Sequence, residues 1–205
     1  MLELGIGTGL FAIPSHEAGI DIEGLEISQV MIDVVGQRAP NLKVHKGDMR
    51  DFTINRKYDA IFALSSVLVF VANEQEIKQC LQRCYDHLES KGILLLELPN
   101  HSVEISQNNN SQEVHHNKDQ STIVVIQSAV RGQDWNETWH VFKQNDGGLS
   151  HQKVVCQEFL YSPTTLAGQL RDVGFDIIET RGDLLGNPFD ESNSWRRVIV
   201  CERKD

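Results

Sequence analysis

The residues of this chain that could do chemistry begin within its first ten positions. Glycines occupy alternate positions, Gly5, Gly7 and Gly9, directly after a short apolar run that contains Glu3. Glycine permits positive φ angles and lets a ligand approach the backbone closely. A helix that starts after such a turn presents unpaired N–H groups and the positive end of its dipole. The pattern therefore predicts a strand, a tight turn and a helix N-terminus that could hold a nucleotide-like ligand.

Two acidic residues further along the chain could complete the same site. Glu26 ends an expected strand, 20–26, and could accept hydrogen bonds from both hydroxyls of a ribose. Asp48 follows an expected strand, 42–45, and could accept a hydrogen bond from an adenine amino group, while the backbone of Met49 addresses a ring nitrogen. The structural alternatives are a solvated carboxylate at a strand end for Glu26 and a turn cap for Asp48.

The elements that must position these residues alternate through position 98. The pattern predicts strands over 1–4, 20–26, 42–45, 58–64 and 93–98, with helices over 10–18, 28–36 and 73–92 between them. Such alternation is typical of βαβ units on a parallel sheet. A polar segment, 101–120, is expected to be an exposed loop, and strands over 121–130, 137–143 and 152–161 are expected to form an antiparallel insertion. A helix over 162–174 and strands over 175–180 and 198–202 complete one domain, 1–205, with 101–161 as its insertion.

Composition narrows the class of protein. The chain has 205 residues, is 40% hydrophobic and carries a net charge of −10, which disfavours nucleic acids and anionic membranes as partners. No apolar run approaches the ~20 residues of a membrane span, and no signal peptide is present. Its four cysteines, Cys80, Cys84, Cys156 and Cys201, form no C-x-x-C motif and are expected to be reduced thiols; Cys80 and Cys84, four apart on one face of an expected helix, are expected to pack in the core. These features predict a cytoplasmic protein.

Four segments resemble successive motifs of the class I S-adenosylmethionine (SAM)-dependent methyltransferases. They are Glu3-Leu4-Gly5-Ile6-Gly7-Thr8-Gly9, Gly24-Leu25-Glu26-Ile27-Ser28, Lys46-Gly47-Asp48-Met49-Arg50 and Tyr58-Asp59-Ala60-Ile61-Phe62. The resemblance is strong over 1–100 and looser over 160–205. The insertion resembles that of small-molecule N-methyltransferases of the glycine and amino-sugar kind. The implied fold is α/β, a Rossmann-like doubly wound, mostly parallel sheet with an antiparallel last strand and a β-rich insertion.

The resemblance also implies where the cofactor SAM would bind. Glu3 belongs to the first motif, and Gly5, Gly7, Thr8 and Gly9 would line the methionine and ribose part of SAM. Glu26 would bind the ribose hydroxyls, Ile27 and Met31 would contact the adenine, Asp48 and Met49 would read the adenine edge, and Leu64 would cover the cofactor beside the acceptor. Family members usually carry an N-terminal cover helix, which we expect to be missing from this chain.

The implied reaction is an in-line displacement in which the lone pair of the acceptor attacks the methyl group of a sulfonium. Alignment and desolvation can supply much of the rate, so no catalytic residue is assigned. Candidates for contact with a small-molecule acceptor are Ser65, Trp135, Trp139 and His140. The tryptophans could equally pack the insertion against the core or join two copies as a homodimer. His115 and His116 lack a nearby acidic or cysteine partner at ligand spacing, so no metal site is predicted.

The sequence therefore predicts a SAM-dependent methyltransferase that acts on a nitrogen or oxygen of a small molecule. One alternative is an NAD(P)-dependent oxidoreductase, against which Leu10 counts because it replaces the third glycine of the dinucleotide fingerprint. The other alternative is a truncated or degenerate SAM-binding fold without activity. The acceptor, its methylated atom and the oligomeric state stay open at this point.

Overall fold

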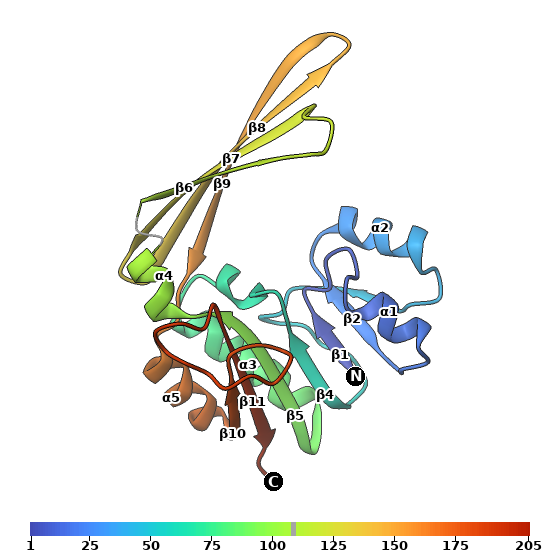
Figure 1. Ribbon diagram of the computed structural model, residues 1–205. Coiled ribbons are helices and arrows are strands. Elements are labelled where there is room, and N and C mark those ends of the chain that lie inside the picture. Colours follow the sequence, from blue (N-terminus) through green and yellow to red (C-terminus); the bar gives the residue numbers. More distant parts are fainter. Residues whose placement is uncertain (108–109) are drawn as a thin grey trace.

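A seven-stranded sheet forms the centre of the molecule. The computed structural model describes residues 1–107 and 110–205 (Figure 1). The strands are β1 (Leu2–Leu4), β2 (Glu23–Glu26), β3 (Val44–Lys46), β4 (Tyr58–Ala63), β5 (Leu88–Pro99), β10 (Phe175–Arg181) and β11 (Arg196–Arg203). Their order is β10-β11-β5-β4-β1-β2-β3. The pairs among β1 to β5 are parallel, and β11 is antiparallel to both of its neighbours, which confirms the predicted fold class.

Helices cover both faces of this sheet. They are α1 (Ala12–Glu17), α2 (Gln29–Arg38), α3 (Glu74–His87) and α5 (Pro163–Val173), and a 3₁₀ turn, η1 (Val67–Phe70), precedes α3. Buried side chains of α3 and α5 share the larger core with the strands, and those of α1 and α2 form a smaller second core. Ser28, Asn73 and Ser162 cap the N-termini of α2, α3 and α5 as predicted. No helix within the described part is long and apolar enough to cross a membrane.

The first helix is shorter than the sequence predicts. It begins at Ala12 and has six residues, because Gly9, with φ +82°, keeps the preceding backbone in a turn. Pro14 lies in the first turn of this short helix, where its missing N–H leaves no intrahelical bond unmade. The second strand is also shorter than expected and begins at Glu23.

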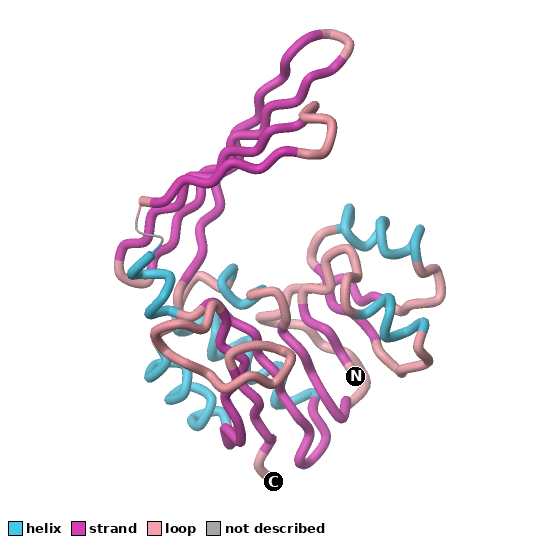
Figure 2. Tube along the Cα trace, in the orientation of Figure 1, coloured by secondary structure: helices cyan, strands magenta, loops and turns pink. Residues whose placement is uncertain are grey.

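A second sheet stands away from the first, and we refer to its four strands as the arm. The arm consists of β6 (Ser111–His116), β7 (Thr122–Arg131), β8 (Asp134–Asn145) and β9 (Gly148–Phe159), paired antiparallel in sequence order. Figure 2 shows these strands projecting beyond the carboxyl edge of the central sheet. A short helix, α4 (His101–Gln107), links β5 to the arm.

The prediction of a polar loop over 101–120 was therefore wrong. The segment contains α4, and its residues Ser111–His116 form the edge strand β6, which pairs with β7. Five of the six residues of β6 are exposed, so its sequence lacks the alternation of apolar and polar residues that indicates a strand. The sequence of β6 is therefore typical of a loop. Asn108 and Asn109 of this segment lie outside the described residues.

Candidate cofactor and acceptor sites

The carboxyl ends of the first strands meet around one cavity. Its volume is about 350 Å³. It is lined by Gly5, Gly7, Leu25, Glu26, Ile27, Ser28, Met31, Gly47, Asp48, Met49, Arg50, Val67, Phe70 and Val71. These residues follow β1, β2, β3 and β4, so the cavity occupies the edge at which open α/β sheets bind ligands.

Glu26 ties two of these segments together. Glu26 is buried, and its Oε2 accepts a hydrogen bond from the backbone N–H of Gly7 at 2.9 Å. Its Oε1 accepts from the N–H groups of Ile27 at 2.9 Å and Ser28 at 2.8 Å. Each carboxylate oxygen can accept further bonds. The carboxylate is thus fixed by backbone donors while it lines the cavity, an arrangement suited to a ligand that donates two hydroxyl groups.

The turn after β1 needs glycine at two positions, for two different reasons. Gly5 has φ +61°, and a Cβ atom there would lie 2.2 Å from Cγ2 of Val67, which lines the cavity. Gly9 has φ +82°, and a Cβ atom there would lie 2.6 Å from Cγ1 of Ile13. Gly5 therefore lets the turn approach the residues after β4, whereas Gly9 lets α1 pack beneath it.

Asp48 is held in place by a neighbouring arginine. Its Oδ2 accepts from Nη2 of Arg50 at 2.5 Å, and its Oδ1 accepts from Nε of Arg50 at 2.9 Å. The guanidinium of Arg50 also donates to Glu76 of α3 at 2.8 Å. The hydrogen bonds from Arg50 hold the pKa of Asp48 below its usual range. The carboxylate is therefore ionised and oriented at the wall of the cavity.

Seven of the eleven predicted cofactor residues line the cavity. These are Gly5, Gly7, Glu26, Ile27, Met31, Asp48 and Met49. Thr8, Gly9 and Leu64 do not line it: the Thr8 carbonyl accepts from Arg38, and Leu64 is buried at the end of β4. The prediction missed Val67, Phe70 and Val71, because an apolar 3₁₀ turn carries no chemical signature in the sequence.

Glu3 lies within β1, behind the cavity wall. Its side chain is only 5% exposed, and its Oε2 is buried without a hydrogen-bond partner among the described residues. Burial raises the pKa of Glu3 to about 7, while a hydrogen bond from the backbone of Ala12 opposes the rise. Burying this carboxyl group lowers the free energy of unfolding. Stability therefore does not explain why a glutamate occupies this position of the first motif.

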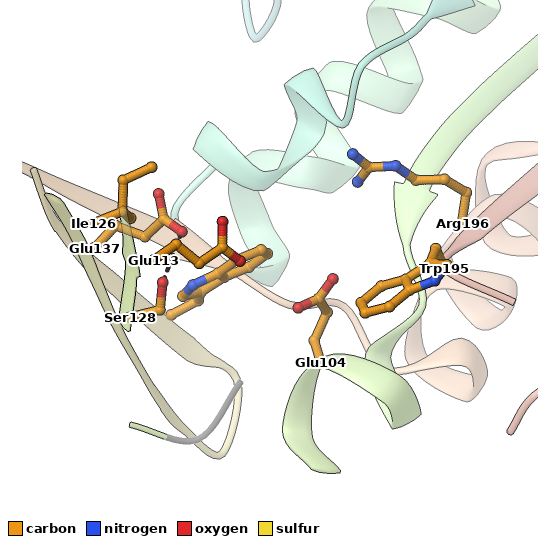
Figure 3. Close-up of a pocket in the computed structure, with 8 residues that line it drawn as sticks. Glu104, Glu113, Ile126, Ser128, Glu137, Trp195 and Arg196 are labelled. Atoms are coloured by element: carbon orange, nitrogen blue, oxygen red, sulfur yellow. Dashed lines mark hydrogen bonds between the residues drawn. The ribbon is translucent and has the colours of Figure 1, made fainter. Parts of the chain in front are cut away.

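A second cavity lies between the arm and the central sheet. Its volume is about 310 Å³, and it is lined by Glu104, Glu113, Ile126, Ser128, Trp135, Glu137, Trp195 and Arg196. Figure 3 shows Ser128 and Glu137 on the arm, Trp195 and Arg196 on the side of the central sheet, and Glu104 of α4 between them. Of the predicted acceptor residues, Trp135 lines this cavity.

The other predicted acceptor residues have different positions. Trp139 does not line the cavity, but its Nε1 donates to Oε2 of Glu137 at 2.7 Å. His140 lies on the opposite face of β8, where its ring stacks on His151. Ser65 follows β4, and its N–H donates to Oε2 of Glu97 at 2.7 Å. Among the described residues, no group of three or more potential metal ligands is present.

Known proteins resemble this chain in sequence and in fold. Residues 1–92 match the family described as a methyltransferase domain. Over 97 residues the chain is 30% identical to the dTDP-3-amino-3,6-dideoxy-alpha-D-glucopyranose N,N-dimethyltransferase of Streptomyces fradiae, a match that covers 47% of this chain and 38% of that enzyme. A related N,N-dimethyltransferase of Streptomyces venezuelae is also 30% identical, with 41% of it covered. The match thus spans about two fifths of the length of these curated relatives.

Solved structures extend the similarity of fold to the whole chain. The CcbJ methyltransferase of Streptomyces caelestis superposes with a TM-score of 0.88 at 21% identity, over 100% of this chain and 83% of that one. A sugar N-methyltransferase from a Streptoalloteichus species superposes with a TM-score of 0.80 at 20% identity, over 100% and 79%. Segment 1–92 is therefore similar to the methyltransferase domain family, and the chain as a whole shares the fold of these solved structures.

Proposed function

We propose that the chain binds SAM in the cavity around Glu26 and transfers its methyl group to a nitrogen of a small molecule. The observation that carries this proposal is the carboxylate of Glu26, which is fixed by Gly7, Ile27 and Ser28 while it faces the cavity. A ribose that donates both hydroxyls to this carboxylate would place the adenine toward Met31 and Met49 and the methionine toward Gly5 and Gly7.

The reaction needs little covalent help from the protein. The nitrogen lone pair would form a bond to the methyl carbon while the carbon–sulfur bond breaks. The electron pair of the broken bond would stay on sulfur, which becomes a neutral thioether. Positive charge moves from sulfur to nitrogen, and any excess proton on nitrogen leaves separately. The contribution of this chain is to align the two reactants and to exclude water from them.

Nitrogen is favoured over oxygen by the names of the relatives and by the reactivity of amines. The relatives from Streptomyces fradiae and Streptomyces venezuelae are named as N,N-dimethyltransferases of amino sugars. An amine is the stronger nucleophile near neutral pH and needs no strong base once it has lost its proton. An amino sugar or a similar small amine is therefore the acceptor that we propose.

The arm supplies a surface through which two copies could pair. Its face opposite the second cavity carries Val114, Ile123 and Val155, which are 58%, 39% and 58% exposed. We propose a homodimer through this face. Light scattering coupled to size-exclusion chromatography should give twice the mass of one chain, and Val155→Lys should shift the mass to that of one chain; a monomeric wild type would refute the dimer.

Calorimetric titration tests the cofactor part of the proposal. We expect micromolar binding of SAM and of its demethylated product, and no binding of NADH. Glu26→Ala should weaken SAM binding at least 100-fold, because it removes the acceptor for both ribose hydroxyls, while the matched exposed change Glu17→Ala should leave it unchanged. Binding of NADH but not SAM would favour the oxidoreductase alternative. A folded chain that binds neither would fit a degenerate fold and contradict the proposal.

A further inference from the structure

The second cavity gathers all three tryptophans of the chain. Trp135 and Trp195 line it, and Trp139 reaches its border through the hydrogen bond to Glu137. The Nε1 of Trp135 is fully buried and has no hydrogen-bond acceptor among the described residues. Large aromatic surfaces beside an unused donor are typical of a cavity that holds a ligand rather than of a packed core.

Glu137 is a carboxylate of this cavity whose two oxygens both accept hydrogen bonds. Ser128 Oγ donates to its Oε1 at 2.9 Å, and Trp139 Nε1 donates to its Oε2 at 2.7 Å (Figure 3 draws the first bond). Within 1–107 and 110–205, no cation forms an ion pair with Glu137. The carboxylate is therefore oriented by neutral donors, and no ion pair within the described part of the chain balances its charge.

The surroundings of Glu137 are negative as well. Glu104 and Glu113 line the same cavity, and Glu158 lies beside Trp135 on the next strand. Burial, together with the charges of Glu137 and Glu104, raises the pKa of Glu158 to about 7. Burial is the larger cause of this rise, and the part that comes from Glu137 and Glu104 reflects like charges close together, beside which a bound cation would be favoured.

The one arginine that lines the cavity is bonded to the loop after β4. Arg196 Nη1 donates to Oγ of Ser66 at 2.9 Å. Ser65 and Ser66 have φ angles of 51° and 60°, an uncommon conformation for residues other than glycine, and Val67 next to them lines the first cavity. The two cavities are thus connected through consecutive residues, since Ser66 binds Arg196 of the second cavity and Val67 lines the first.

We propose that the second cavity recognises the methyl acceptor as an ammonium cation, with Glu137 as the counter-charge and Trp135 and Trp195 as aromatic walls. This inference rests on the proposed function, because it assumes that the acceptor is an amine. Carboxylate and aromatic faces both attract a cation at such short range. The bound ammonium then gives one proton to a carboxylate of the cavity, which leaves a neutral amine, with its lone pair free to attack, and a carboxylic acid.

Tryptophan fluorescence is a direct assay, because two of the three tryptophans line this cavity and the third, Trp139, donates to Glu137. The full chain, saturated with the demethylated cofactor product, would be titrated with glucosamine, whose amino group is cationic. We expect a saturable change in emission with glucosamine. N-acetylglucosamine, which is neutral, and sodium chloride at equal ionic strength should cause none.

Substitutions in the second cavity test whether glucosamine binds there. Glu137→Gln should weaken glucosamine binding at least tenfold while SAM affinity changes less than twofold, and the matched change Glu89→Gln, at the far end of β5, should have no effect. Trp135→Phe, which removes only the indole N–H and part of the aromatic face, should weaken binding about threefold if Glu137→Gln fails to fold. Equal responses to the neutral sugar, or no loss in either variant, would overturn this inference even where SAM binding supports the proposed function.

Discussion

Glu3→Gln should make the protein more stable at neutral and alkaline pH. The carboxyl group of Glu3 is 5% exposed, one of its oxygens is buried without a partner in the described structure, and its pKa is raised to about 7. A glutamine has nearly the same shape and keeps an oxygen that can accept from Ala12. It therefore resembles the protonated acid at every pH and removes the cost of burying a charge.

The size of the effect follows from the shift in pKa. The ordinary pKa of this group is 4.5, so a value of about 7 in the folded protein is a rise of ~2.5 units, or about 3 kcal/mol at ~1.36 kcal/mol per unit. Because the folded protein binds this proton more tightly than the unfolded chain does, the contribution is most favourable below pH 4.5. It is lost as pH rises from about 4.5 through about 7. Glu3→Gln should thus be similar to the wild type at pH 4 and up to about 3 kcal/mol more stable at pH 8.

Urea unfolding of both proteins at pH values from 4 to 8 measures this difference directly. Other carboxyl groups contribute equally to both and cancel in the difference. Glu17→Gln, an exposed change on α1, is the control and should give no pH-dependent difference. A difference between Glu3→Gln and the wild type that stays constant with pH would refute the reasoning. If Glu3 serves the proposed cofactor site, the more stable variant should also bind SAM at least tenfold more weakly.

Three further predictions test the packing around the two sites. Gly9→Ala should lower the free energy of unfolding by at least ~2 kcal/mol, because its φ is +82° and its Cβ would overlap Ile13; circular dichroism in urea measures this. Tyr161→Phe should cost about 1–2 kcal/mol, since the buried hydroxyl donates to the Val71 carbonyl at 2.5 Å, and the same unfolding curves would show it. Unfolding followed by tryptophan fluorescence should coincide with unfolding followed by circular dichroism if 1–205 is one folding unit, and an earlier fluorescence transition would mean that the arm detaches first.

The central sheet could be predicted because its strands are buried and its turns have chemical signatures. Val30 and Val34 at helical spacing, Ser28 as a cap and the apolar run Ile93–Leu98 each specify an element from local sequence alone. The order of the strands could be expected only by resemblance, since nothing in a parallel strand states which neighbour it pairs with. Boundaries were the weakest part, as at Ala12 and Glu23, where tertiary contacts decide how far an element extends.

Segment 101–120 could not be predicted for a different reason. α4 has seven residues, too few for a helical period to be visible, and its first turn depends on Asn100, whose side chain accepts from the N–H of Ser102 at 3.2 Å. Asn100 is itself 1% exposed and donates to the carbonyls of Glu191 and Ser194, about 90 residues away along the chain. Such an element is specified by distant partners that no local pattern contains.

The candidate site, like the fold, could be predicted from the sequence only in part. Glu26 and Asp48 were predicted correctly to approach one cavity, because the carboxyl ends of parallel strands meet at one edge. Glu137 was missed, since a glutamate in an exposed antiparallel strand looks like a solvated side chain. Only the register that places it opposite Ser128 on β7, and the indole of Trp139 two residues away, distinguish it.

The edge strand β6 has a consequence for how the protein behaves in concentrated solution. Its outer backbone groups are a template on which another strand could pair, which is a common start of aggregation. Glu113, His115 and His116 place polar and ionisable side chains along this edge, and among the described residues of β6 only Val114 is a large apolar residue. Pairing with an added strand would take part of the water from these polar side chains, so strand addition at this edge is disfavoured. The polar β6 edge therefore limits growth of the arm in that direction and leaves its broad faces open to a ligand or a partner.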